Sequence, residues 1–319
     1  MNALKPVIFL FSLLMSWPVI SCMNSENDYI FNEEQLLSYI KTLSSDNFSG
    51  RKFATPGNQQ AQEFIVSTLQ QLAVPAFEDK YQHSFNHERL FDNKQGANVI
   101  GFIEGTSQKD QYIVLSAHFD HLGKKGSKVF NGADDNASGT AALLAYASML
   151  IKKPLKHSVV LLFTDGEEVN LLGAKAFIKQ QKKRVKKIRL NVNLDMIAGN
   201  YKTKELNYIN HDFDLILTSS LQKDFHQFQK SQALKIKKGF KRGSNNRSML
   251  AKTNWRMASD HAVFYQADIP FIYFGVGTHK NYHSTKDNYD NINSEFFIAA
   301  TKSIYQQLLF LDKNIIFTD

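Results

Sequence analysis

Histidine and carboxylate side chains gather between Ala117 and Asp195, each at or near the end of a predicted strand. The residues there that could bind a metal or move a proton are His118, Asp120, Asp135, Glu167, Glu168 and Asp195. His283, in the stretch YHSTKDN, comes much later. Imidazole and carboxylate groups are typical zinc ligands. Because no cysteine pair accompanies them, we expect a catalytic site gathered from several loops of one sheet and not a zinc finger.

His118 and Asp120 are two residues apart in AHFDH, so both side chains point the same way if the segment is extended. A metal-bound imidazole commonly donates its other N–H to a carboxylate, which fixes the ring. We therefore expect His118 to bind metal, with Asp120 as its partner, and His121 to lie outside the site. A polar surface turn explains this short motif equally well when it is taken alone.

The stretch GADDNASG, residues 132–139, places two carboxylates in a tight loop before a helix. A carboxylate has two oxygens and can bridge two cations, and small residues let the backbone pass close to them. Capping of the next helix is the alternative, but it explains only one of these residues.

Glu167 and Glu168 follow an apolar strand in the stretch DGEE. One of two adjacent carboxylates can bind a metal while the other takes a proton from metal-bound water, whose pKa the metal lowers. An acidic helix N-terminus explains the pair in isolation. Asp195 and His283 would each be structural if alone, and it is their combination with the other motifs that favours a metal site.

The N-terminus predicts export. Val7–Ile20 is an apolar run too short for a membrane span, and it ends in VISC, which resembles the lipobox of bacterial lipoproteins. Cys22 is the only cysteine. We expect a signal peptide over residues 1–21, a lipid on Cys22, a tether over 22–31 and a catalytic domain over 32–319. The mature protein would then be periplasmic and anchored by its lipid to a cell membrane; the outer membrane is favoured, and which membrane carries the anchor stays open. A cleaved secretory peptide and an uncleaved anchor are the alternatives.

The formal net charge is +8, with basic residues concentrated in Lys182–Arg189 and Lys235–Arg242. Solvated helix faces and loops explain these clusters better than attraction to a membrane or to acidic ligands. No motif supports nucleic-acid binding.

Strands are predicted at 97–104, 112–117, 158–163 and 188–194, and helices at 32–43, 59–72, 138–150, 170–181, 212–230 and 295–311. Ala258–Gly275 predicts a short helix and then a strand. This alternation is typical of βαβ units in a largely parallel sheet covered on both faces. Lys235–Ala251 is expected to be a loop at the rim of the site.

In this order, the motifs from SGRKFATPG to HSTKDNYDNIN resemble the co-catalytic zinc peptidases of the bacterial leucyl aminopeptidase type, in peptidase clan MH. That family includes glutamate carboxypeptidases and, more distantly, glutaminyl cyclases. The resemblance implies a three-layer α/β/α sandwich with a mixed, mainly parallel sheet. It also implies two zinc ions per chain.

The same resemblance implies a role for each residue. His118 and Asp195 would bind one zinc, Glu168 and His283 the other, and Asp135 would bridge them. Glu167 would be the general base, and Asp120 would orient His118. Asp260 and His261 match a further family motif without an assigned role.

The expected activity is removal of N-terminal residues from peptide substrates, with Glu167 taking a proton from water and delivering it to the leaving amine. Three alternatives remain: a glutaminyl-peptide cyclase, which would bind one zinc, a carboxypeptidase or dipeptidase on the same fold, and an inactive binding lipoprotein. The inactive form should have lost a ligand or Glu167, and none is missing. The oligomeric state stays open.

Overall fold

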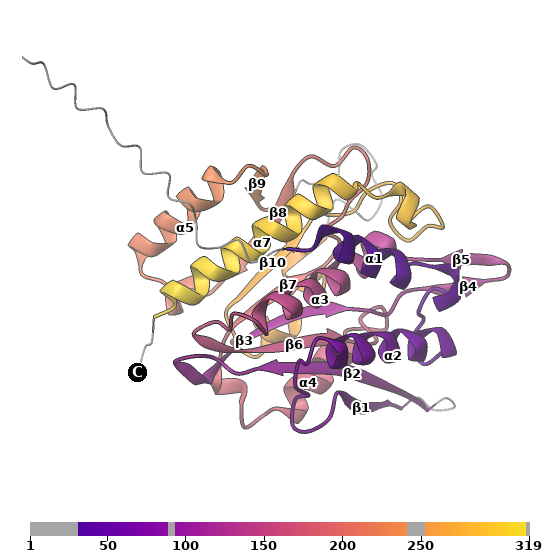
Figure 1. The fold of residues 1–319 in the computed structure, drawn as a ribbon, viewed down its shortest axis with the longest axis horizontal. Helices are drawn as coiled ribbons and strands as arrows, with labels where there is room; N and C mark the ends of the chain where they lie inside the picture. The colour runs from indigo at the N-terminus through magenta and orange to yellow at the C-terminus, as the bar shows by residue number, and fades with distance from the viewer. Residues whose placement is uncertain (1–30, 89–92, 241–252, 317–319) are drawn as a thin grey trace, which may run out of the picture. The chain divides into compact units, whose positions relative to one another are not determined.

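The computed structural model describes residues 31–88, 93–240 and 253–316 (Figure 1). The expected signal peptide, Cys22 and all but the last residue of the expected tether lie outside these residues, so they stay predictions. Within the described part of the chain, no helix is both long enough and apolar enough to cross a membrane.

The described chain folds around one mixed sheet of eight strands. In spatial order the strands are β1 (Gln82–His87), β2 (Lys94–Ile103), β6 (His157–Thr164), β3 (Gln108–His118), β7 (Ile188–Leu194), β10 (Phe271–Gly275), β8 (Leu206–His211) and β9 (Ile236–Lys238). The four central strands, β6, β3, β7 and β10, are parallel, whereas β2 and β8 pair antiparallel to their inner neighbours. The carboxyl ends of the central strands therefore meet at one edge of the sheet.

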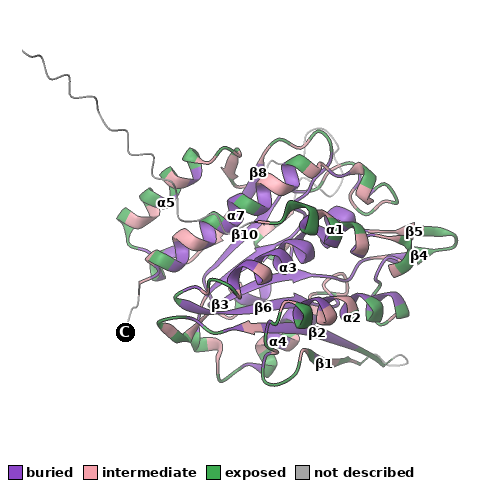
Figure 2. Ribbon diagram, in the orientation of Figure 1, coloured by how far each residue is buried: buried purple, intermediate pink, exposed green. Residues whose placement is uncertain are grey.

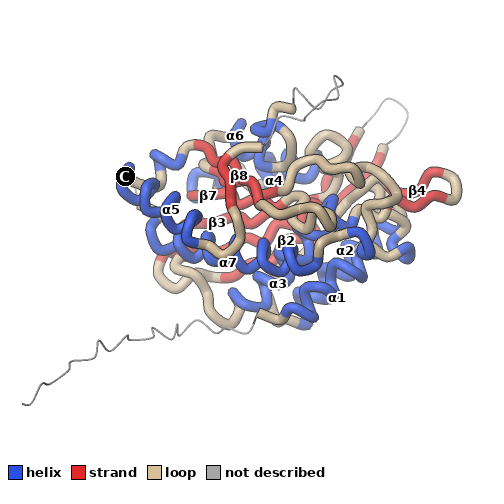
Figure 3. Tube along the Cα trace, turned by 90° about the horizontal axis from the view of Figure 1, so that it is seen from above, coloured by secondary structure: helices blue, strands red, loops and turns tan. Residues whose placement is uncertain are grey.

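Helices cover both faces of the sheet, as expected. One face carries α1 (Glu33–Leu43), α2 (Pro56–Gln71), α3 (Gly139–Leu150), α5 (Ser219–Ser231) and α7 (Ser294–Asn314), and the other carries α4 (Leu172–Gln180) and α6 (His261–Gln266). Figure 3 shows α6 on one side of the strands and α3, α7 and α1 on the other. The predicted α/β/α sandwich is confirmed.

Side chains along the central strands alternate between two apolar cores, because successive residues of a strand point to opposite faces. On β3, Ile113 and Leu115 pack with α3 and α7, whereas Val114 packs against α4 and α6. On β6, Leu161 lies in the same core as Ile113 and Leu115, and Leu162 lies in the same core as Val114. The central sheet is buried on both faces (Figure 2), which gives the strand ends a rigid base.

The start of α3 lies against the end of β7. A Cβ atom added at Gly139 would lie 2.5 Å from the backbone oxygen of Leu194, so only glycine permits this approach. The Asn136 side chain reinforces the contact by donating to the same Leu194 oxygen at 2.8 Å. This junction brings the loop that carries Asp135 beside Asp195.

Most predicted elements are confirmed, and the predicted strand at 188–194 matches β7. The sequence did not reveal β1, β8 or the hairpin of β4 (Gly123–Lys125) and β5 (Lys128–Phe130). The predicted helix at 212–230 was wrong at its start. Asp212 has a φ of 55°, and α5 begins only after Thr218, which caps it by accepting from the Leu221 amide. Of the loop expected at Lys235–Ala251, three residues form β9 and residues 241–251 are outside the described part.

Candidate metal centre

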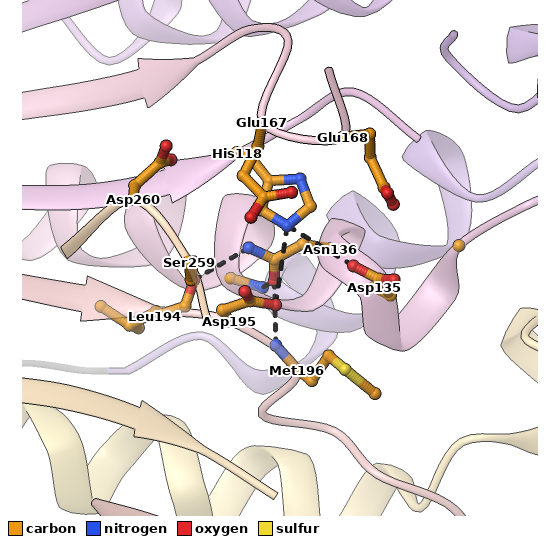
Figure 4. A network of polar contacts seen from close by, with 12 residues as sticks. His118, Asp135, Asn136, Glu167, Glu168, Leu194, Asp195, Met196, Ser259 and Asp260 are labelled. Carbon is orange, nitrogen blue, oxygen red and sulfur yellow. Dashed lines mark hydrogen bonds and ion pairs between the residues drawn. The ribbon is translucent and has the colours of Figure 1, made fainter. Parts of the chain in front are cut away.

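The predicted site residues come together at the carboxyl ends of the central strands. His118 ends β3, Asp195 directly follows β7, and Glu167 and Glu168 lie just beyond β6. Two further residues come from loops: Asp135 precedes α3, and His283 follows β10. The structure thus brings every predicted ligand to one place (Figure 4 shows all of them except His283).

A first set of donor atoms surrounds His118. Its Nε2 atom lies 3.4 Å from Oδ1 of Asp135 and 3.6 Å from Oδ1 of Asp195. Figure 4 shows the ring directed between these two carboxylates. The separations exceed the usual hydrogen-bond range of about 2.7–3.2 Å. They match the distance of about 3.4 Å expected between two ligands of a tetrahedral zinc ion.

A second set of donor atoms lies on the other side of Asp135. His283 Nε2 is 3.1 Å from Oδ2 of Asp135 and 3.3 Å from Oε1 of Glu168. Both oxygens, and Oδ1 of Asp195 in the first set, are buried without a hydrogen-bond partner among the described residues. Unpartnered carboxylate oxygens facing imidazole nitrogens are a suitable environment for a bound cation. Asp135 therefore offers one oxygen to each set.

The expectation that His121 lies outside the site was wrong. Its ring is buried, and its Nδ1 atom lies 3.0 Å from Oε1 of Glu168 and 3.7 Å from Oδ2 of Asp135. The expectation assumed that the segment stays extended beyond His118, so that alternate side chains diverge. Strand β3 ends at His118, and the chain then turns.

Asp120 lies beside His118, but its carboxylate mainly supports the glutamate pair. The oxygens of this carboxylate accept hydrogen bonds from the backbone amides of Glu167 at 3.0 Å and Glu168 at 3.3 Å. The Nδ1 atom of His118 is closer to the backbone carbonyl oxygen of Asp120, at 3.1 Å, than to its carboxylate, at 3.7 Å. Asp120 thus joins the end of β3 to the loop after β6.

Glu167 belongs to neither donor set, and its carboxylate lies beside the His118 ring (Figure 4). Burial raises the pKa of Glu167 well above its usual range. The nearby charge of His118 opposes this shift, and the carboxylates of Asp195 and Asp260 add to it. A carboxylate with a raised pKa is a suitable proton acceptor at neutral pH.

Asp260, which had no assigned role, lies near Glu167. Its Oδ2 atom accepts a hydrogen bond from the hydroxyl of Thr164. Burial raises the pKa of Asp260 to about 7, although the nearby charge of His118 and the Thr164 hydrogen bond act in the opposite direction.

Two aspartates that sequence reasoning did not assign hold the loop of Asp135. The Asp287 carboxylate accepts from the backbone amides of Asp134 at 2.8 Å and Asp135 at 3.0 Å. Asp134 is itself buried, and its Oδ1 atom accepts from the amides of Ala198 and Gly199 at 2.7 and 2.8 Å. The first aspartate of GADD, Asp134, and the aspartate of HSTKD, Asp287, were the available signals for this support.

A buried arginine, Arg51, ties three segments around the site together. Its guanidinium donates to the backbone oxygens of Phe119 at 2.7 Å, Leu43 at 2.6 Å, Asn131 at 2.6 Å and Gly132 at 2.9 Å. Burial lowers the pKa of Arg51 to about 10, against the opposing effect of nearby carboxylates. Arg51 stays charged at neutral pH and fixes the loop that leads to Asp135.

Replacing Arg51 with alanine is expected to lower the free energy of unfolding by more than about 3 kcal/mol, because four backbone carbonyl oxygens, three of them in buried hydrogen bonds, lose their donor. Arg51→Lys is the matched control, since it keeps the charge but offers at most three donors from one atom, and it should have an intermediate effect. Urea unfolding of the two variants and the unchanged protein measures this. A loss below about 1 kcal/mol for Arg51→Ala would contradict the assigned role.

Comparisons with known proteins agree with this architecture. The family model described as peptidase family M28 matches residues 98–307. Aminopeptidase YwaD of Bacillus subtilis (strain 168) is 27% identical over 68% of this chain and 46% of its own length. The alkaline phosphatase isozyme conversion protein of Escherichia coli (strain K12) is 30% identical over 48% of each chain. The chain thus spans about half the length of these relatives.

Two kinds of solved structure share the fold. A zinc aminopeptidase from Bacillus subtilis aligns over 86% of this chain and 95% of its own, with a TM-score of 0.65 and 16% identity. The glutaminyl cyclase of Porphyromonas gingivalis aligns over 89% of this chain and 98% of its own, with a TM-score of 0.66 and 17% identity. The fold alone therefore does not separate the two activities.

Proposed function

The chain belongs to peptidase family M28, and we propose that it is a zinc-dependent aminopeptidase that removes N-terminal residues from peptides. The observation that carries the proposal is the position of Asp135, whose two oxygens face two separate sets of donor atoms. This arrangement supports two zinc ions per chain. His118 and Asp195 would complete one site, and Glu168 and His283 the other.

The donor chemistry fits zinc, because imidazole and carboxylate groups supply both sets without a thiolate. Bound zinc would supply Lewis-acid chemistry, lowering the pKa of a water and polarising the scissile carbonyl group. Glu167 would accept the proton of that water on its carboxylate and pass it to the amine nitrogen of the leaving peptide. Asp120 would hold Glu167 in place through the backbone amide of Glu167.

A glutaminyl cyclase is the second candidate, favoured by the similarity to the Porphyromonas gingivalis structure. A carboxypeptidase is the third, because a relative in Caenorhabditis elegans, 31% identical over 46% of this chain and 19% of its own length, is named glutamate carboxypeptidase 2 homolog. The presence of both donor sets favours a peptidase with two metals over a cyclase with one.

One experiment separates the three activities. Peptides that begin with glutamine, leucine or glutamate are incubated with the purified protein, and the products are identified by mass spectrometry. The proposal predicts that the N-terminal residue is released and that a chelator stops the reaction. Loss of ammonia from the glutamine peptide without cleavage would indicate a cyclase, and release of the C-terminal residue a carboxypeptidase. Either result would overturn the proposal.

A further inference from the structure

We infer that His121 is an additional protein ligand of the metal held by Asp135, Glu168 and His283, an inference that rests on the proposed metal sites. The Nδ1 atom of His121 lies 3.0 Å from Oε1 of Glu168 and 3.7 Å from Oδ2 of Asp135. His283 Nε2 approaches the same two oxygens at 3.3 and 3.1 Å. All four separations are close to the distance of about 3.4 Å between ligands of a tetrahedral zinc ion.

The two imidazole rings lie side by side without occupying the same position. Their centroids are 5.8 Å apart, and their planes are inclined by 65°. His121 Nδ1, Asp135 Oδ2 and Glu168 Oε1 all lie within 4.8 Å of one another, which is close enough to hold one ion. His283 Nε2 faces the same two carboxylate oxygens.

A hydrogen bond from His121 to Glu168 does not account for this contact. Neither ring nitrogen of His121 has a hydrogen-bond partner within the described ranges, and Oε1 of Glu168 has none either. A buried imidazole with both nitrogens unpaired destabilises the folded state. Binding of a metal at Nδ1 would satisfy that nitrogen and Oε1 of Glu168 together.

The fold holds the His121 ring rigidly in this position. The His121 backbone amide donates to the Arg51 carbonyl oxygen at 3.2 Å. Gly132, with a φ of 55°, passes so close that an added Cβ would lie 2.5 Å from Cγ of His121. The backbone carbonyl oxygen of Gly132 in turn accepts a hydrogen bond from the Arg51 guanidinium. These contacts with Arg51 and Gly132 thus fix the position of the His121 ring before a metal binds.

The inference makes the two metal sites unequal. With both His121 and His283 as ligands, that site would have four protein donor atoms, whereas the site with His118 and Asp195 has three, counting one oxygen of Asp135. Zinc sites with four protein ligands are typically structural, and catalytic sites keep a position open. We therefore expect the His121 site to hold its metal more tightly and the His118 site to present the open position to water.

Zinc titration of the metal-free, full-length protein tests the inference in His121→Ala and His121→Asn. Asparagine places an N–H donor near the position of Nδ1 but is a poor zinc ligand, so it preserves a hydrogen bond to Glu168 and not a metal bond. Loss of an outer-shell partner costs metal affinity about 10- to 100-fold, and loss of a direct ligand should cost at least as much. Both variants should weaken one of two zinc sites by about 100-fold or more.

His226→Ala is the matched control, because His226 is exposed on α5 and should leave both affinities unchanged. As a second readout, the visible spectrum of the cobalt-loaded protein should change in the His121 variants, since one site loses a ligand. Circular dichroism of each metal-free variant checks folding, and His121→Asn decides the question if the alanine variant does not fold.

The outcomes separate this inference from the proposed function. Unchanged zinc affinity and an unchanged cobalt spectrum in His121→Asn would overturn His121 as a ligand. A single zinc in the unchanged protein would contradict the proposed pair of metal sites. If the unchanged protein bound one zinc and His121→Ala weakened its binding, His121 would still be supported as a ligand. If His121→Ala left the affinity for that one zinc unchanged, both the pair of metal sites and the role of His121 would be overturned.

Discussion

Replacing Glu167 with glutamine is expected to lower kcat for peptide hydrolysis by about 10²- to 10⁴-fold, the usual contribution of a general base. Glutamine keeps the shape of the side chain but cannot accept the proton. Because Glu167 belongs to neither donor set, zinc content should not change. Steady-state kinetics and metal analysis of the same preparation give both quantities.

Glu168→Gln is the matched control for this prediction. Glu168 is adjacent in sequence and its Oε1 atom faces His283 at 3.3 Å, so this change should weaken zinc binding at one site. The two neighbouring glutamates should therefore separate proton transfer from metal binding. Loss of zinc in Glu167→Gln, or full activity in that variant, would contradict the assigned role.

Replacing Asp135 with asparagine is expected to weaken zinc binding at both sites and to reduce activity to background. An amide group offers one oxygen, whereas the Asp135 carboxylate offers Oδ1 to His118 and Oδ2 to His283. The change also removes a negative charge that the nearby imidazoles stabilise. Burial raises the pKa of Asp135, but His118, His121 and His283 together hold it well below its usual range. Zinc titration and hydrolysis assays measure the two effects.

Asp195→Asn provides the comparison, because Asp195 faces only the His118 set. It should weaken one site and leave the other intact. If Asp135→Asn also weakened only one site, Asp135 would not bridge two metals, and the proposed centre would need to be reassigned.

The sequence predicted that His118, Glu167, Glu168 and Asp195 lie close together because each follows a strong strand signal. The stretches before His118, Glu167 and Asp195 are apolar and bounded by small or acidic residues, which is typical of central parallel strands. Since the carboxyl ends of such strands share one edge, their positions in the sequence implied proximity in the fold. The structure confirms this proximity for all the predicted ligands.

Edge elements were harder to predict for a physical reason. Strand β1 reads QHSFNH and β8 reads LNYINH, and neither has the continuous apolar pattern of a central strand. The pairing of β1 is determined by its contacts with β2, and the pairing of β8 by its contacts with β10, a strand that is distant in the sequence. Local pattern contains little information about such pairing.

The supporting residues of the site were missed because their environment is tertiary. Arg51 is fully buried, which is rare for arginine, and its four acceptors lie on three separate segments. From the sequence, His121 was expected to lie outside the site, and only the turn after β3 brings its ring close to Glu168. Such residues follow from packing between loops, which spacing along the chain does not reveal.

Zinc content per chain can be determined by elemental mass spectrometry during stepwise removal and return of zinc, with peptide hydrolysis followed in parallel. We expect two zinc ions per chain with unequal affinities, and release of N-terminal residues that stops when the metal is removed and resumes when it is returned. One zinc per chain in a fully active preparation, or hydrolysis that survives complete zinc removal, would contradict this expectation.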